Sequence, residues 1–418
     1  MQLVAYGAQD IYLTGNPQIT FFKVVYRRHT NFAVESIEQT FNGQADFGKR
    51  VTATVSRNGD LIQQMYLEVV LPAQAGAAVN TRWAYGVGNA LVKQAEIEIG
   101  GQLIDRQYGD WMNIWTELST PAGKRAGYDN MVGNQAPING QLGGIDAITN
   151  TVRLYVPLQF WFNRNPGLAL PLIALQYHEV KLNLELRTAN ELVTNVNALV
   201  IAAATVTTGL SCKLYVDYIY LDTDERRRFA QVSHEYLIEQ VQFTGSETVS
   251  GNNKNVTLNF NHPVKELIWV HTTPANITRK SWFNYSGQTV NGSADSFQTA
   301  LLQLNGHDRF SVRNSDYFRK VQNYEHHTRV PRVGVDLDVD DQREQYIYSY
   351  SFALSPEEHQ PSGTCNFSRI DNAVLQLKYD ANVQTSLQTN GTMNLNVYAV
   401  NYNVLRIMSG MGGLAYSN

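Results

Sequence analysis

The sequence has few cysteines and no long apolar segment. Only Cys212 and Cys365 occur among 418 residues, so the repeated cysteine spacing of a small disulfide scaffold is absent. We expect both to be reduced thiols in the core of a cytosolic protein. The longest apolar run, residues 198–206, is far shorter than the ~20 residues that cross a bilayer, and the amino terminus lacks the basic and apolar regions of a signal peptide. These absences predict a soluble chain that is not exported.

Concentrated charge of one sign is also lacking. The net charge is -4, and residues 1–222 carry 16 basic and 18 acidic side chains against 17 and 19 in the remainder. The only basic clusters, Arg27-Arg28 and residues 226–228, are typical of solvated or ion-paired surfaces. Because strong DNA binding needs a clustered basic surface, we expect no direct nucleic-acid binding.

What the sequence does contain favours β-strands. It has 23 Tyr and 16 Phe, and its 30 Gly supply turns. The clearest strand is 180–186, in which Val180, Leu182, Leu184 and Leu186 share one face. Spacings of three and four between apolar residues, which are typical of a helix, are scarce. They predict one helix, over 106–118. Residues 119–150 are expected to form a long excursion from the sheet.

The first half contains about eight strand-like segments, marked by alternation and turn residues. They cover residues 36–42, 49–57, 63–71, 92–100, 152–158, 180–186, 196–206 and 211–221. Neighbouring strands that no helix separates pair antiparallel by default. Eight of them predict a jelly-roll sandwich, which shields its edges by pairing two sheets.

The second half repeats the first in the same order. The matching segments are 67–72 with 267–271, 97–106 with 302–309, 180–186 with 374–379, and 213–221 with 394–405. The predicted fold class is therefore all-β, with two tandem eight-stranded antiparallel jelly-roll sandwiches and short helices in the connecting loops. We expect one domain at 1–222, with an amino-terminal segment, and a second at 223–418, with a carboxy-terminal tail. The charged stretch 222–229 is the expected connector.

Motifs for chemistry are incomplete. Residues 43–50 nearly match a phosphate-binding loop, but Arg50 stands where a hydroxyl should bind Mg²⁺. Residues 410–415 match a dinucleotide fingerprint with no room for its helix. The pairs His178-Glu179, His234-Glu235 and His326-His327 lack metal-site spacing. We therefore predict no catalytic, cofactor-binding or metal-binding residues.

Two features stay open at this level. The acidic run Asp336, Asp338, Asp340 and Asp341 can hold a hard cation or can be a solvated loop or a charged edge strand. Six glycosylation sequons lie in the second half, although no signal peptide precedes them. They are at Asn255, Asn276, Asn284, Asn291, Asn366 and Asn390.

Six stretches resemble a known family over nearly the whole chain. They are TGNPQITFFKVVYRRHTNFA (14–33), GGQLIDRQYGDWM (100–112), PLQFWFNRNPGLALPLIALQYHEV (157–180), LNGHDRF (304–310), PSGTCNFSRIDNAVLQL (361–377) and NYNVLRIMSGMGGLAYSN (401–418). In these the chain resembles the double jelly-roll major capsid proteins of the nucleocytoplasmic large DNA viruses, of the iridovirus and chlorovirus type.

The resemblance implies a structural virion protein and no enzyme. It implies a homotrimeric, pseudo-hexagonal capsomer that contacts neighbouring capsomers, vertex (penton) proteins and minor capsid proteins. It also implies an icosahedral shell that overlies an internal lipid membrane and is assembled in the host cell cytoplasm. The family places the amino-terminal segment on the inner side of the shell, so residues 1–30 are expected to contact neighbours or minor proteins.

The alternative is a tandem β-sandwich that binds or processes carbohydrate. Exposed aromatic rings in such proteins stack on sugars, and Trp83, Trp161 and Trp282 lie near expected loops.

Overall fold

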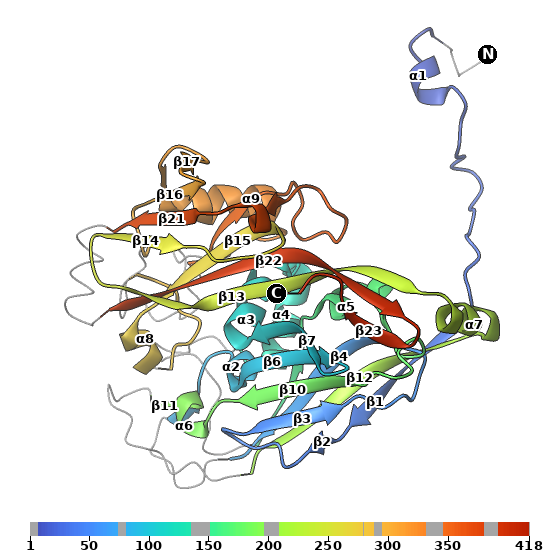
Figure 1. Ribbon diagram of the computed structural model, residues 1–418, viewed down its shortest axis with the longest axis horizontal. Coiled ribbons are helices and arrows are strands. Elements are labelled where there is room, and N and C mark those ends of the chain that lie inside the picture. Colours follow the sequence, from blue (N-terminus) through green and yellow to red (C-terminus); the bar gives the residue numbers. More distant parts are fainter. Residues whose placement is uncertain are drawn as a thin grey trace.

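The computed structural model describes residues 7–73, 81–134, 151–195, 209–278, 280–287, 295–331, 346–379 and 392–417. Its main sheets form two β-sandwiches that lie against each other (Figure 1). The first sandwich is blue to green in the figure, and the second is yellow to red. Every strand pairing in these ranges is antiparallel.

The first sandwich contains two large sheets. One has the order β1-β12-β4-β8, with β9 beside β4, and the other has the order β2-β3-β10-β6-β7. The strands of the first sheet are β1 (Phe32–Gln39), β12 (Ser211–Leu221), β4 (Leu61–Leu71), β8 (Val152–Pro157) and β9 (Leu170–Pro171). Those of the second are β2 (Phe41–Asn42), β3 (Arg50–Thr54), β10 (Val180–Leu186), β6 (Val92–Ile99) and β7 (Gln102–Tyr108). A small separate sheet pairs β5 (Thr81–Trp83) with β11 (Val193–Asn195).

The second sandwich has the same plan. One sheet has the order β13-β22-β15-β19, with β20 beside β15 and β23 beside β22. The other has the order β14-β21-β16-β17, with β18 beside β16. The strands of the first sheet are β13 (His234–Val249), β22 (Met393–Met408), β15 (Pro263–Thr272), β19 (Tyr348–Ser351), β20 (Cys365–Asn366) and β23 (Met411–Leu414). Those of the second are β14 (Asn253–Thr257), β21 (Ala373–Lys378), β16 (Thr299–Leu304), β17 (His307–Asp308) and β18 (Arg313–Asn314).

The strand order identifies each sandwich as a jelly roll. When the principal strands are counted along the chain, from β1 to β12 in one sandwich and from β13 to β22 in the other, both sandwiches pair them as 1-8-3-6 and 2-7-4-5. This arrangement is the double Greek key of the jelly roll. The predicted all-β fold of two tandem jelly rolls is confirmed.

The internal repeat also has a structural basis. Its four matched segments fall on strands of equal rank: β4 with β15, the β6-β7 hairpin with β16-β17, β10 with β21, and β12 with β22. The two hairpins turn at Gly100-Gly101 and at Asn305-Gly306, and all four residues have positive φ. Such turns favour Gly and Asn, which explains why this pair of segments is recognisable in the sequence.

The helices are short connections. They are α1 (Ile11–Thr14), α2 (Val87–Leu91), α3 (Gly109–Ser119), α4 (Ala122–Val132), α5 (Trp161–Arg164), α6 (Ala189–Leu192), α7 (Thr223–Gln231), α8 (Pro274–Thr278) and α9 (Gln322–His326), with single turns η1 (Pro166–Leu168) and η3 (Phe367–Arg369) and the π-helical η2 (Tyr317–Val321). None of the described helices is both long and apolar enough to cross a bilayer.

One detail of the predicted organisation is wrong, and one helix was not predicted. The helix predicted from residue 106 begins at Gly109, because Arg106 still belongs to β7 and pairs across the hairpin with Glu96, 2.7 Å from Nε to Oε1. The expected connector is itself helical. In α7 the Asp222 carboxylate accepts a hydrogen bond from Glu225 N at 2.9 Å, which caps the helix. The predicted strand at 196–206 lies outside the described residues.

The apolar core occupies the inside of both sandwiches. Its buried side chains form one cluster that continues from one sandwich into the other. The expected boundary at 222/223 therefore separates the sheets but not the apolar contacts, and the division into domains stays a prediction.

Strand β10 allows a direct test of the core. Leu184 is fully buried, whereas Glu185 lies on the outer face and pairs with Lys93 at 2.6 Å. We expect Leu184→Asp to bury an unpaired carboxylate and to destabilise the fold by several kcal/mol, on the order of 3–5. Glu185→Gln should change the unfolding free energy by less than about 1 kcal/mol, because exposed ion pairs contribute little. Denaturant unfolding and the yield of soluble protein would check both. Equal stability of the two variants would contradict the assignment.

Candidate functional site: the junction of the two sandwiches and the amino-terminal arm

The two sandwiches meet along the edge strands β7 and β13. The Gln240 side-chain amide donates to the Ile104 carbonyl oxygen, and Val241 N donates to the Asp105 carboxylate at 3.2 Å. Beside these bonds the rings of Tyr108 and Phe243 pack edge to face, 5.2 Å between centroids. Backbone and side-chain groups of β7 thus satisfy polar groups on an edge that would otherwise be open.

Aromatic side chains fill the space behind this edge. Trp111 of α3 lies 5.5 Å from the ring of Tyr398 in β22, and both are buried. Further along, the Arg187 guanidinium lies 3.9 Å from the ring centre of Trp282, whose indole N–H donates to Glu191 O at 2.9 Å. Apolar and cation–π contacts therefore join residues more than 90 positions apart.

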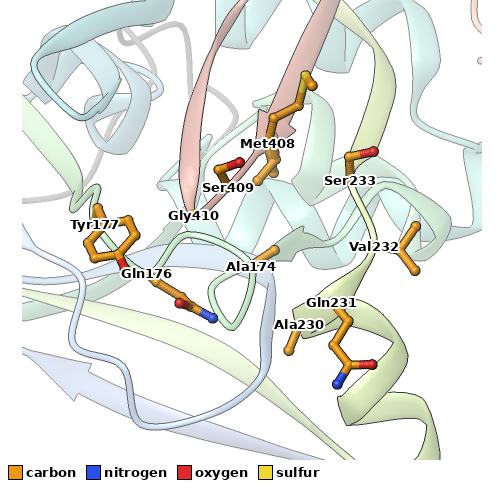
Figure 2. A pocket seen from close by; sticks show the side chains of 11 residues that line it. Ala174, Gln176, Tyr177, Ala230, Gln231, Val232, Ser233, Met408, Ser409 and Gly410 are labelled. Carbon is orange, nitrogen blue, oxygen red and sulfur yellow. The ribbon is translucent and has the colours of Figure 1, made fainter.

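At the end of β22 the junction is open. The β22-β23 turn approaches the segment before β10, where Tyr177 N donates to Gly410 O at 3.0 Å. Next to this contact is a hollow of about 480 Å³, bounded also by Ala230, Val232 and Met408 (Figure 2). The hollow lies between the two sandwiches at the end of α7, which leads from one sandwich into the other.

A buried charged cluster also holds the junction. The Glu239 carboxylate of β13 lies 3.2 Å from Arg164 of α5 and 2.8 Å from Lys265 of β15. Burial disfavours the ionised carboxylate, but Arg164, His359 and Lys265 outweigh burial and lower the Glu239 pKa to about 2. Glu239 is therefore an anion that links the two sandwiches at neutral pH.

The pKa of Asp105, another carboxyl group in the junction, is shifted in the opposite direction. Burial is the largest effect on this carboxyl group and raises its pKa to about 7, although the Val241 N–H and the Gln107 side chain favour the anion. The protonation state of Asp105 thus changes near neutral pH.

This behaviour predicts a pH-dependent stability. Between pH 3.8 and about 7 the unfolded chain releases the Asp105 proton while the folded chain keeps it, so the free energy of unfolding falls as pH rises through this window. The total over this window is on the order of 4 kcal/mol. Asp105→Asn keeps an oxygen for Val241 N–H but cannot ionise. We expect the variant to lose less stability than the parent between pH 5 and pH 8 in thermal unfolding. The exposed Asp308→Asn is the control, and identical pH profiles for Asp105→Asn and the parent would contradict the prediction.

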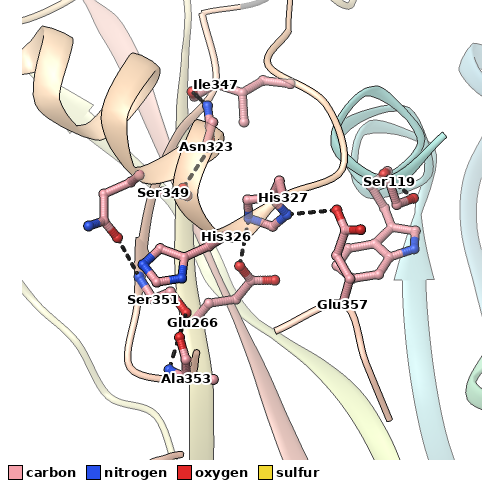
Figure 3. A network of polar contacts seen from close by, with 12 residues as sticks. Ser119, Glu266, Asn323, His326, His327, Ile347, Ser349, Ser351, Ala353 and Glu357 are labelled. Carbon is pink, nitrogen blue, oxygen red and sulfur yellow. Dashed lines mark hydrogen bonds and ion pairs between the residues drawn. The ribbon is translucent and has the colours of Figure 1, made fainter. Parts of the chain in front are cut away.

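A second buried network ties α9 to the sheet of the second sandwich (Figure 3). His327 Nε2 lies 2.9 Å from the Glu266 carboxylate of β15, and Nδ1 lies 3.0 Å from Glu357. Burial alone would lower the pKa of His327, but Glu266 and Glu357 raise it to about 9. The imidazole is therefore charged at neutral pH and neutralises a fully buried glutamate.

Replacing the charged His327 imidazole should lower the free energy of unfolding. Because the folded-state pKa is raised, His327 contributes its full stability below pH 6.5, and the contribution is lost as pH rises through about 9. We expect His327→Gln to destabilise the fold by about 3–5 kcal/mol at pH 7, since Glu266 is left buried without a countercharge. Adding Glu266→Gln should restore part of the loss. Denaturant unfolding of the two single variants and the double variant would check this, and strictly additive effects would refute the coupling.

The amino-terminal arm, residues 7–31, is the other conspicuous feature. It leaves the first sandwich beside α7 and projects far from the rest of the molecule, with α1 near its far end (Figure 1). All of its described residues except Asp10 are exposed. Phe21 and Phe22 are 88% and 98% exposed. Several large apolar side chains exposed along one segment are typical of an interaction surface.

The sequence-based candidates can now be placed. Cys212 and Cys365 are free and partly buried. Asn276 is buried and donates to Asn284 O at 3.1 Å, whereas Asn255 and Asn366 are exposed. The acidic run Asp336 to Asp341, Asn291 and Asn390 lie outside the described residues. Within those residues no cluster of three or more His, Cys, Asp or Glu could hold a metal ion.

The tryptophans do not form a sugar platform. Trp83 and Trp161 are buried, so neither ring can stack on a ligand from solvent. Trp282 is covered by Arg187. The expectation rested on their predicted positions near loops, but Trp83 ends the short strand β5 and Trp161 begins helix α5, and both rings face the core. The carbohydrate-binding alternative is not supported.

The fold is a double jelly roll whose two sandwiches are joined by buried polar and aromatic contacts, and the comparisons give its family. Residues 20–222 match the family described as "Major capsid protein N-terminus", and residues 225–413 match "Large eukaryotic DNA virus major capsid protein". The chain is 54% identical to the major capsid protein of Pyramimonas orientalis virus and 46% identical to that of Paramecium bursaria Chlorella virus 1. In each case 100% of this chain and 99% of the relative are covered.

Solved structures agree with this assignment. A quasi-atomic model of the PBCV-1 virus capsid matches with a TM-score of 0.78 and 42% identity, covering 96% of this chain and 100% of the other. The Faustovirus major capsid protein has the same fold, with a TM-score of 0.74 at 12% identity over 96% and 94% of the chains. The chain therefore belongs to the major capsid proteins of large eukaryotic DNA viruses. It is a structural protein of the virion capsid and not an enzyme.

Proposed function

We propose that three copies of the chain form the capsomer and that these capsomers tile an icosahedral shell. The observation that carries the proposal is the equal strand order of the two sandwiches. A closed ring of three such chains presents six similar sandwiches around its axis. Such a tile is hexagonal in outline and packs on a hexagonal lattice with near-equivalent edges.

The same geometry requires further proteins. A hexagonal tile does not fill a fivefold vertex, so a separate vertex (penton) protein is a partner. The exposed arm supports contacts with neighbouring capsomers or minor capsid proteins on the inner side of the shell, above an internal lipid membrane. Assembly in the host cell cytoplasm and the absence of direct nucleic-acid contact complete the proposal. Cryo-electron microscopy of particles would test these partners, and a vertex filled by this same chain would contradict the first of them.

We further propose that the domain boundary lies at 222/223, where α7 begins. This helix connects the last strand of the first sandwich with the first strand of the second, and none of its residues is buried. Its capped first turn keeps the connection short and ordered. Cleavage by a protease at an inserted site in α7, with both fragments remaining associated, would support this boundary. Cleavage that unfolds the protein would count against it.

The capsomer proposal is tested by molar mass. Three chains of 47.0 kDa give about 141 kDa. Light scattering coupled to size exclusion should give this value across micromolar concentrations, and negative-stain images should show hexagonal particles. A monomer or dimer at all concentrations would overturn the proposal.

A further inference from the structure

The two sandwiches differ in how their equivalent sheets are buried. In the second sandwich, nine of the ten residues of β15 are buried, and so is the middle of β22. Both faces of this sheet are therefore covered. In the first sandwich, the equivalent strands β4 and β12 largely alternate between buried and half-buried residues. One face of that sheet packs on the core, and the other is only partly covered.

Part of the cover on the second sandwich comes from the first. Strand β7 lies along β13, and the helix that follows it, α3, places Trp111 on Tyr398. Helix α5 adds Arg164, which reaches Glu239. The outer face of the β13-β22-β15-β19 sheet is thus covered in part by the fifth strand and by helices of the first sandwich, while Asn323 and His327 of its own sandwich cover β19 and Glu266.

The equivalent outer face of the first sandwich is rich in tyrosine. Tyr66 and Tyr215 are cross-strand neighbours whose rings stack 5.3 Å apart, and Tyr155 lies 6.2 Å from Tyr66. All three are half-buried in the single chain. Ion pairs flank them, with Lys213 at 3.1 Å from Glu38 and Arg153 at 3.9 Å from Glu68. We call this surface the tyrosine face. Tyrosine surrounded by charged groups is the composition typical of a protein interface.

The second sandwich has a matching but unoccupied surface. Its fifth strand, β17, is followed by β18, η2 and α9, in the place that α3 takes after β7. Along this segment Val312, Val321 and Tyr324 are 59%, 40% and 79% exposed. The segment and the tyrosine face lie on opposite sides of the molecule, beside α9 and beside β1 and β12 respectively (Figure 1). One chain therefore cannot bring them together.

We propose that the tyrosine face of one copy binds the 312–324 segment of a second copy. This contact repeats between chains the packing that the first sandwich makes on the second within a chain. It joins two different surfaces, so each copy offers one free surface of each kind. A contact of this type closes into a ring of three when each copy is rotated by a third of a turn from the last, and otherwise gives an open filament. The inference rests on the proposed capsomer and assigns the residues that hold it together.

The test uses one substitution on each surface and a matched control. Tyr215→Arg places a cation between Glu38 and Glu68, which the single chain accommodates. Tyr324→Arg charges the opposite surface. Thr52→Arg makes the same kind of change on the outer face of the other sheet of the first sandwich, at a half-buried position of β3. We expect both tyrosine variants to weaken association at least about tenfold and to give the 47.0 kDa monomer where the parent is a trimer. Thr52→Arg should remain a trimer.

The outcomes separate the two proposals. If the parent is a trimer and both tyrosine variants are trimers of equal stability, this inference is wrong and the capsomer stands. If the parent is a monomer, the capsomer proposal itself fails.

Hydroxyl-radical labelling of the parent trimer decides the case in which the variants do not fold. Tyr324, which is 79% exposed in the single chain, should be protected relative to Tyr177, which is 75% exposed there. Labelling of Tyr324 as fast as Tyr177 would overturn the inference.

Discussion

The structure depends on covering a sheet whose two faces are both buried. Strands β15 and β22 carry apolar side chains toward their own core and toward the first sandwich, and a face of this kind is unstable in water. Strand β7 and helix α3 supply the missing cover. Once they are in place, the relative position of the two sandwiches is fixed, because the covering elements belong to one sandwich and the covered sheet to the other. The side-by-side arrangement is therefore a consequence of burial and does not require a rigid linker.

Polar groups make that arrangement specific. Apolar faces can slide over each other at little cost, but the Gln240 bond to Ile104 O and the Val241 bond to Asp105 have a single register. Glu239 adds an ion pair that is satisfied only when Arg164 of the first sandwich is within reach. Buried charges of this kind contribute little net stability but strongly disfavour alternatives in which they are unpaired.

The strands could be predicted from the sequence, but the tertiary contacts that surround them could not. Alternation in β10 and the ordered repeat predict two jelly rolls, because period-two burial and Gly or Asn turns are local signals. The apolar run from Leu267 to Val270 also indicates a sheet buried on both faces, but it does not say what covers the second face. The start of α3 and the formation of α7 were missed, although the capping pattern from Asp222 to Glu225 is visible in the sequence. The junction could not be predicted, since Asp105 and Val241 meet only through tertiary packing. Nor could the roles of Trp83 and Trp161, because a loop aromatic can point either way.

The amino-terminal arm gives the chain a long reach. Residues 7–31 are 25 residues that make few contacts with the sandwiches, and a chain of this length spans up to roughly 80 Å when extended. A tether of that length can bind a site well beyond the adjacent subunit. Its exposed aromatic residues would then be covered only in an assembly large enough to contain such a site. In the proposed shell, the length of the arm would therefore make burial of its aromatic side chains depend on how far the lattice around it has grown.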